Sequence, residues 1–203
     1  MGNSADRHGF SFVANGLVEN RLLRNWLLWL SVGLMIGLTA FNWFYQPQFK
    51  DLFWLVTAFL ILFVLFWQSL KLALINVLVN LLALLITLNG FMLFVDLGNM
   101  SLLLMMVPLG LIIDDGIHFF SRYVRAQQSV FTDAESAVRF SMATIGRPIW
   151  VTSWVLFIGL AVLVFSQNEL VQLASLITLF ALIIATFLIL LIVPAVLISI
   201  QNR

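Results

Sequence analysis

The sequence predicts an all-α integral membrane protein, and three observations support this prediction. Of its 203 residues, 63% are hydrophobic and only 9% are charged, whereas a soluble domain averages about 25% charged residues. Long runs of Leu, Ile, Val and Phe carry no alternation with a period of two, so they indicate helices rather than the strands of a barrel. Several of these runs reach the roughly 20 residues that a helix needs to cross hydrocarbon about 30 Å thick.

The apolar runs divide into six predicted membrane-spanning helices, separated by segments that carry turn-forming or charged residues. These helices cover residues 25–44, 52–70, 72–95, 101–123, 149–166 and 171–200. Residues 1–24 are mixed and polar and form a predicted N-terminal tail. The expected organisation is therefore this tail followed by one six-helix membrane domain over residues 25–203.

The longest polar segment between two spans predicts a further helix over residues 132–146. Thr132 is followed three residues later by Glu135, which is the spacing of a capping box. Gly146 and Pro148 are typical of a helix end. Because the segment is amphipathic, we expect it to lie on the cytoplasmic surface of the membrane; a solvated connector helix is the alternative.

The basic residues predict the orientation of the chain in the membrane. With the N-terminus in the cytoplasm, nine of the ten Lys and Arg residues fall on the cytoplasmic side and only Lys50 falls outside, as the positive-inside rule requires. Asp96 and Glu169 then lie on the outer side. Both termini are predicted to be cytoplasmic.

The stretch GLIIDDGIHFF, residues 110–120, places ionisable side chains inside the predicted fourth span. A charged side chain near the bilayer centre costs on the order of 2.5–3.5 kcal/mol. Burial among helices, contact with water or protonation would each relieve this cost. Carboxyl groups that bind and release protons at this depth form a proton relay, and we predict this role for Asp114 and Asp115.

Neighbouring residues are predicted to support the relay. His118 lies four residues after Asp114 and therefore on the same helix face. Thr152 and Ser153 open the fifth span and are expected to face the aspartates. Gly110 is one turn before Asp114, where a small residue would allow close helix packing. Other polar residues within the spans are assigned to packing between helices: Asn76, Asn80, Thr87, Ser175, Thr178 and Thr186.

Three motifs resemble the resistance–nodulation–division (RND) superfamily of permeases, closest to the MmpL and hopanoid-type predicted exporters. In chain order they are GLIIDDGIHFFSRY, TIGRPIWVTSWVLFIGLAVLVFS and LLIVPAVL. The resemblance implies one six-helix half of a two-half permease in a bacterial inner membrane, with the proton relay at Asp114 and Asp115. It also implies export of a lipid or other amphiphile, driven by the proton gradient. Only YQPQFK stands where the family carries a large extracytoplasmic porter domain.

Two functions remain open. The first is a half-sized RND-like transport module that works as a homodimer or with a partner membrane or periplasmic subunit. The second is a non-transporting lipid-sensing or scaffold module, resembling a sterol-sensing domain. Neither a G-x-G-D nor a D-D-x-x-D motif is present around the aspartates, so enzyme activity is not expected.

Cofactors, metals and nucleic acids are not expected to bind. Asp114 and His118 could offer a metal two ligands, and the motif supplies no others. The chain has no cysteine and a net charge of +1, which gives no reason to expect binding to nucleic acid. The expected surroundings are the lipid bilayer and a partner subunit.

Overall fold

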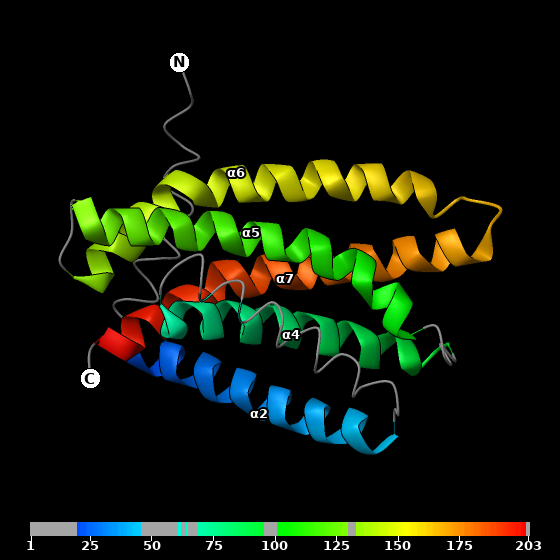
Figure 1. Cartoon of the computed structure of the whole chain (residues 1–203), viewed down its shortest axis with the longest axis horizontal. Helices are drawn as coiled ribbons and strands as arrows, with labels where there is room; N and C mark the ends of the chain where they lie inside the picture. The colour runs from blue at the N-terminus through cyan, green and yellow to red at the C-terminus, as the bar shows by residue number, and fades with distance from the viewer. Residues whose placement is uncertain are drawn as a thin grey trace.

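The structure is a computed structural model that describes residues 20–45, 61, 64, 69–95, 101–129 and 133–201. These residues form α2 (Arg21–Tyr45), α4 (Leu70–Met92), α5 (Ser101–Ser129), α6 (Ala134–Leu163) and α7 (Glu169–Gln201) (Figure 1). No strand occurs in these ranges. Most of the predicted second span, 52–70, and nearly all of the polar tail lie outside the described residues.

Four helices are long and apolar enough to cross a membrane: Leu70–Met92, Leu104–Gln128, Ala134–Leu163 and Glu169–Ile200. Helix α2 adds an apolar stretch over Leu22–Leu34. The prediction of an all-α integral membrane protein is therefore confirmed. The count of six spans stays a prediction.

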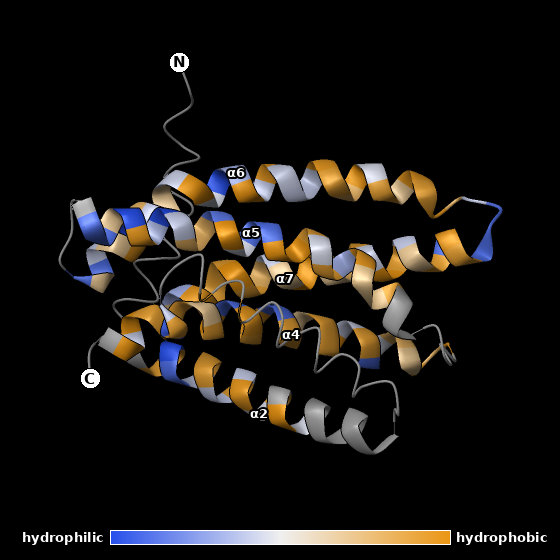
Figure 2. Cartoon of the chain, in the orientation of Figure 1, coloured by the Kyte–Doolittle hydropathy of each residue, from blue (hydrophilic) through white to orange (hydrophobic). Residues whose placement is uncertain are grey.

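Helix α7 is the centre of the bundle, because it packs against each of the other four described helices. Most of its length is strongly apolar, and Ile177, Ala185, Ile189 and Val193 are fully buried. Figure 2 shows hydrophilic residues at the two ends of the bundle and a further hydrophilic patch in the middle of α5. The apolar core is thus interrupted by polar groups at mid-length of one helix.

Polar side chains cap the described helices at three N-termini. Asn20 Oδ1 accepts a hydrogen bond from the Leu23 N–H at 3.1 Å, and Asn168 Oδ1 accepts one from the Leu170 N–H at 3.0 Å. At α6 the cap is Asp133, whose Oδ2 accepts from the Ser136 N–H at 2.9 Å. These bonds satisfy donors that the first turn of a helix leaves free. The predicted capping residue Thr132 lies outside the described residues.

Helix α6 joins two elements that the sequence analysis separates. The predicted surface helix 132–146 and the predicted span 149–166 are one helix that runs through Pro148. A proline removes one backbone donor and normally ends or kinks a helix, but membrane helices tolerate it where nearby Ser or Thr side chains bond the freed backbone groups. Here the carbonyl that loses its donor is that of Thr144, four residues before Pro148, and the helix nevertheless continues to Leu163.

The first part of α6, which was predicted to lie on the cytoplasmic surface of the membrane, packs against the neighbouring helices. Its place relative to that surface stays a prediction. Ala137, Val138 and Met142 are fully buried and belong to the main apolar core. Arg139 and Glu135, whose side chains are partly exposed, form an ion pair at 3.1 Å. The amphipathic pattern is therefore satisfied by contacts with neighbouring helices.

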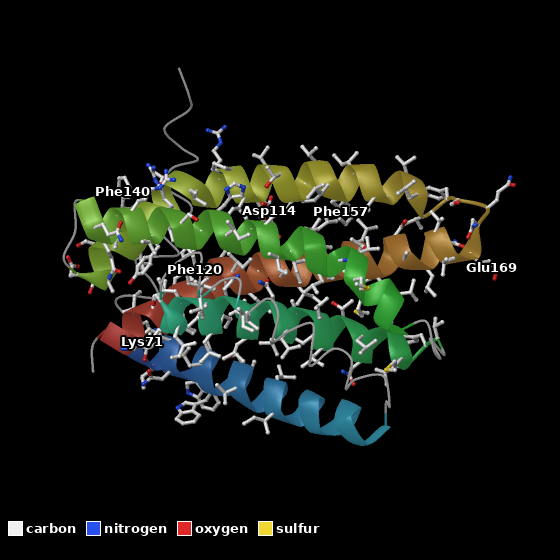
Figure 3. All side chains as sticks on the ribbon, viewed as in Figure 1. Lys71, Asp114, Phe120, Phe140, Phe157 and Glu169 are labelled. Carbon is white, nitrogen blue, oxygen red and sulfur yellow. The ribbon has the colours of Figure 1, made fainter. Side chains whose placement is uncertain are left out.

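The two ends of the bundle differ in charge. Lys71 and Glu169 lie at opposite ends in Figure 3. Helices α2 and α4 begin, and α5 and α7 end, at the end that carries Lys71 (Figure 1). Because α5 ends there, Arg122 and Arg125 lie toward this same end. This separation is what the positive-inside rule predicts, and the identity of the cytoplasmic side stays a prediction.

Candidate intramembrane carboxylate site

Asp114 and Asp115 lie near the middle of the membrane-spanning part of α5 (Figure 3). Successive residues of a helix point about 100° apart, so the two carboxyl groups have different surroundings. Asp115 is buried, with 6% of its surface exposed. The Asp114 side chain is 69% exposed. The two residues predicted to form one relay therefore occupy two separate environments.

Asp115 lies where three helices meet. Ser153 on α6 and Thr186 on α7 place their hydroxyl groups near its carboxyl group. The two hydroxyl oxygens are 2.9 Å apart, and both residues are buried. Asp115 Oδ2 has no hydrogen-bond partner among the described residues. We refer to Asp115, Ser153 and Thr186 as the carboxyl cluster.

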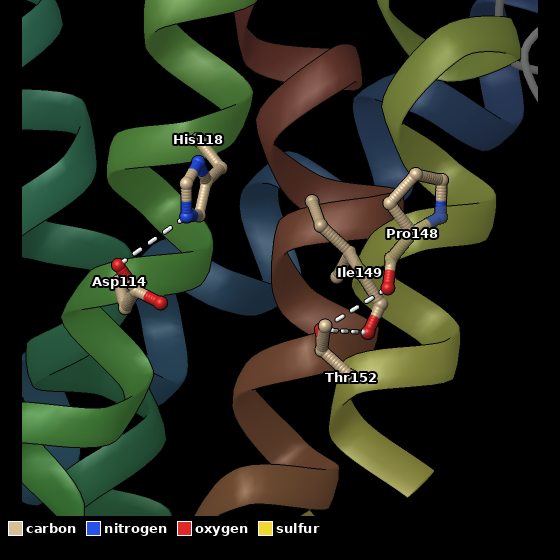
Figure 4. Close-up of polar contacts among 5 residues, drawn as sticks. All are labelled: Asp114, His118, Pro148, Ile149 and Thr152. Carbon is tan, nitrogen blue, oxygen red and sulfur yellow. Dashed lines mark hydrogen bonds and ion pairs between the residues drawn. The ribbon is translucent and has the colours of Figure 1, made fainter. Parts of the chain in front are cut away.

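Asp114 forms a different arrangement with His118, as the i, i+4 spacing predicts. Asp114 Oδ1 and His118 Nε2 are 3.5 Å apart (Figure 4). The imidazole carries a positive charge only when it is protonated. Both side chains lie on an exposed face of α5, where the His118 side chain is 64% exposed. One turn further, the Arg122 guanidinium lies 5.2 Å from the centre of the Phe140 ring.

The side chains of Thr152 and Ser153 make different contacts although the two residues are adjacent in the sequence. Ser153 joins the carboxyl cluster, as predicted. Thr152 does not: its side chain bonds the carbonyl groups of Pro148 and Ile149 on its own helix, at 3.1 and 2.9 Å (Figure 4). The structure thus brings one of the two predicted hydroxyl groups to the aspartates.

Among the described helices, a close approach occurs at Gly116, whereas none is seen at Gly110. Gly110 is exposed, and nothing described lies within 4 Å of the position that a Cβ atom would take. At Gly116 a Cβ atom would collide with Asn76 Oδ1 and would lie 3.0 Å from Asn76 Cγ. The absence of a side chain at Gly116 therefore lets α4 and α5 pack closely.

Thr186, predicted from the sequence to serve only in packing between helices, belongs to the carboxyl cluster. A signal was available, because Ser175, Thr178 and Thr186 are spaced so that they share one face of an otherwise apolar helix. All three are buried. The position of Gly116 had no comparable signal, since a glycine beside two aspartates does not reveal which neighbouring helix it meets.

No group of three or more His, Cys, Asp or Glu side chains that could hold a metal ion occurs among the described residues. The polar groups near Asp115 are hydroxyl groups, whose chemistry is hydrogen bonding and proton exchange. Comparison of the chain with protein-family models, curated proteins and solved structures gave no match. The likeness to RND permeases accordingly rests on the three quoted motifs.

Proposed function

We propose that the chain is a membrane-embedded proton-transfer module, half the size of the helical core of an RND-like transporter, in which Asp115 binds and releases the proton. In this proposal it supports export of a lipid or other amphiphile, together with a second copy or a partner subunit. The observation that carries the proposal is the burial of a carboxyl group at the junction of three helices, in the middle of a membrane span.

The hydrogen-bonding capacity of the carboxyl cluster supports this role. Ser153 and Thr186 have one hydroxyl proton each. The oxygen of Ser153 lies 2.8 Å from the Ile149 carbonyl, and that of Thr186 lies 2.8 Å from the Leu182 carbonyl. Each proton can therefore be directed either to its own helix or to the carboxyl group. The two hydroxyl donors therefore cannot bond the two helix carbonyls and the Asp115 carboxyl oxygens at the same time.

Rotation of the two hydroxyl groups would adapt the cluster to both forms of Asp115. When the carboxyl group is ionised, the hydroxyl protons can turn toward its oxygens. When it is protonated, its own proton becomes a third donor and the hydroxyl protons can return to the helix carbonyls. Those carbonyls also accept the main-chain bonds of their helices, so losing a side-chain bond leaves them satisfied.

Asp114 and His118 would provide the exchange step between the cluster and its surroundings. Both side chains are ionisable, and both lie on the exposed face of α5 next to Asp115. Ionisable groups inside a membrane span usually face water, another protein or one another. A second copy of the chain or a partner subunit would supply this contact.

The first test is proton flux in liposomes containing the purified protein, with an imposed pH gradient and an internal pH-sensitive dye. We expect the wild type to conduct protons and Asp115→Asn to fall to the level of protein-free liposomes. Asn is similar in shape to Asp but does not titrate. Asp114→Asn should lower the flux less completely, because Asp114 is exposed.

Two control variants separate loss of the relay from loss of the fold. Glu169→Gln removes a carboxyl group at the end of the bundle, and Thr87→Val removes a buried hydroxyl group that bonds only its own helix, at Ala83. Both should conduct like the wild type. Wild-type flux in a well-folded Asp115→Asn protein would refute the assignment of Asp115.

A lipid-sensing or scaffold module is the second candidate function, and the surface of α6 favours it. Only 17% of the apolar segment of α6 is buried inside the bundle, against 67% for that of α4. Trp150, Trp154 and Val155 are exposed on it, and the two tryptophan rings pack edge to face. Such a face suits lipid or another membrane helix. Absence of flux in the wild type would favour this function over proton transfer.

A further inference from the structure

A groove of about 350 Å³ lies between α2, α4 and α7, and none of its lining residues belongs to the carboxyl cluster. Ligand pockets usually measure about 300–1,000 Å³, so this volume suits one hydrocarbon chain. The lining is mainly apolar and includes Leu28, Trp29, Ile75, Leu82, Ile192 and Val196. Its lining residues on α2 begin at Asn25 and end at Val32, so the groove follows this helix for about 10 Å.

The groove is not equally apolar along its length. Asn25 and Ser199 line it at the end of the bundle where α2 begins and α7 ends. Deeper in the groove, the Ser31 hydroxyl donates to the Leu28 carbonyl of its own helix at 2.8 Å. The polar lining that can meet a ligand thus lies mainly at one end.

Two cations lie one helical turn beyond the apolar lining at this same end. Arg24 is four residues before Leu28 on α2, and Lys71 is four residues before Ile75 on α4. Residues four apart share a helix face, so both side chains start from the faces that line the groove. Arg24 is buried, whereas Lys71 is exposed at the end of the bundle (Figure 3).

We propose that this groove binds one acyl chain of an anionic phospholipid, with the phosphate held between Lys71 and Arg24. A basic pocket between membrane helices that continues into an apolar groove is complementary to a lipid with a negative headgroup. The phosphate would accept hydrogen bonds from the exposed Lys71 ammonium and Asn25 amide, and the buried Arg24 would add positive charge nearby. This site is independent of proton transfer at Asp115 and does not require it.

The test is fluorescence quenching of Trp29, which lines the groove. A variant keeps Trp29 as its single tryptophan and replaces the other six with Phe: Trp26, Trp43, Trp54, Trp67, Trp150 and Trp154. It is reconstituted in phosphatidylcholine vesicles containing a minor fraction of brominated lipid. We expect stronger quenching by brominated phosphatidylglycerol than by brominated phosphatidylcholine at the same fraction.

Three further substitutions distinguish the groove from general attraction to a charged surface. Lys71→Gln should remove the preference for phosphatidylglycerol, while Arg125→Gln, at an exposed basic residue outside the groove, should keep it. Val32→Phe fills the groove without changing charge and should also remove the preference. Equal quenching by the two lipids would overturn the proposal. Retention of the preference in Val32→Phe would do the same, because the lipid would then bind through charge alone.

Discussion

Helix α5 contacts buried polar groups on two of its sides. The adjacent residues Asp115 and Gly116 make these two contacts. Asp115 lies near the hydroxyl groups of Ser153 on α6 and Thr186 on α7. Gly116 meets α4, where the Asn80 side chain donates to Asn76 Oδ1 at 3.2 Å. We call Asn76, Asn80 and Gly116 the amide cluster. Its two asparagines are as well buried as the members of the carboxyl cluster.

The two clusters differ in whether their hydrogen bonds can be rearranged. A carboxyl group changes its number of donors when it gains or loses a proton, and hydroxyl groups can rotate in response. An amide keeps the same donors and acceptors at every pH of interest. In the amide cluster, Asn76 Nδ2 and Asn80 Oδ1 have no partner among the described residues, and no proton exchange can supply one. Equal burial therefore does not imply equal function.

The largest expected effect on stability is at the close contact of the amide cluster. Gly116→Ala places a Cβ atom against the Asn76 amide, and overpacking of this kind typically costs about 1–3 kcal/mol. The higher helix propensity of Ala, about 1 kcal/mol, offsets part of this. We expect a lower free energy of unfolding in detergent micelles, measured by helix content against denaturant.

Gly110→Ala is the matched control, because no atom of the described residues lies within 4 Å of the position that its Cβ atom would take. It should leave stability unchanged or slightly increased. Combining Gly116→Ala with Asn76→Ala should recover part of the lost stability, since the second substitution removes the atom that collides. If Gly116→Ala is as stable as Gly110→Ala, the close contact between α4 and α5 is absent.

A smaller effect is expected from Asn80→Ala, which removes the donor of the only hydrogen bond within the amide cluster. Polar contacts between residues in membrane proteins average about 0.6 kcal/mol and reach about 1.7 kcal/mol. We expect a loss of stability of this size with proton flux unchanged. A fall in flux comparable to that of Asp115→Asn would instead place the amide cluster in the proton pathway.

Sequence patterns identified the polar residues in the middle of α5 and two of their neighbours, His118 and Ser153, but not which of the two aspartates is buried. The cost of a charge in the membrane singles out Asp114 and Asp115 without any structure. Which of them is buried depends on the rotation of α5 about its axis, and packing against the other helices sets that rotation. For the same reason Ser153, rather than Thr152, meets the carboxyl group.

Helix boundaries were predictable where a cap or an apolar run marks them. Helix α7 extends only slightly beyond its predicted range of 171–200. The continuity of α6 was not predictable, because Pro148 is a common helix terminator and only the surrounding helices determine whether the chain continues through it. Gly110 and Gly116 look alike in sequence, and only the position of Asn76 distinguishes them.

The smallest effect is expected at Asp133, a carboxyl group outside the membrane spans. Hydrogen bonds from the Ser136 backbone and side chain lower the pKa of Asp133 below its ordinary value of 3.8. The cap therefore stabilises the first turn of α6 fully above that ordinary value, and the stabilisation is lost as the pH falls through the lowered pKa. We expect amide hydrogen exchange at Ser136, corrected for its intrinsic pH dependence, to lose protection only in strongly acidic buffer.

Asp133→Asn tests whether this loss comes from titration. Asn is also a good N-cap but does not titrate in this range, so protection at Ser136 should persist into acid. Asp133→Ala removes the cap and should reduce protection at every pH, without altering proton flux. Asp133 and Asp115 differ in this respect. The hydrogen bonds of Asp133 favour its ionised form in water, whereas the hydroxyl groups near Asp115 can accommodate both its ionised and its protonated form inside the bundle. If Asp133→Asn loses protection at the same pH as the wild type, another acidic group controls this end of α6.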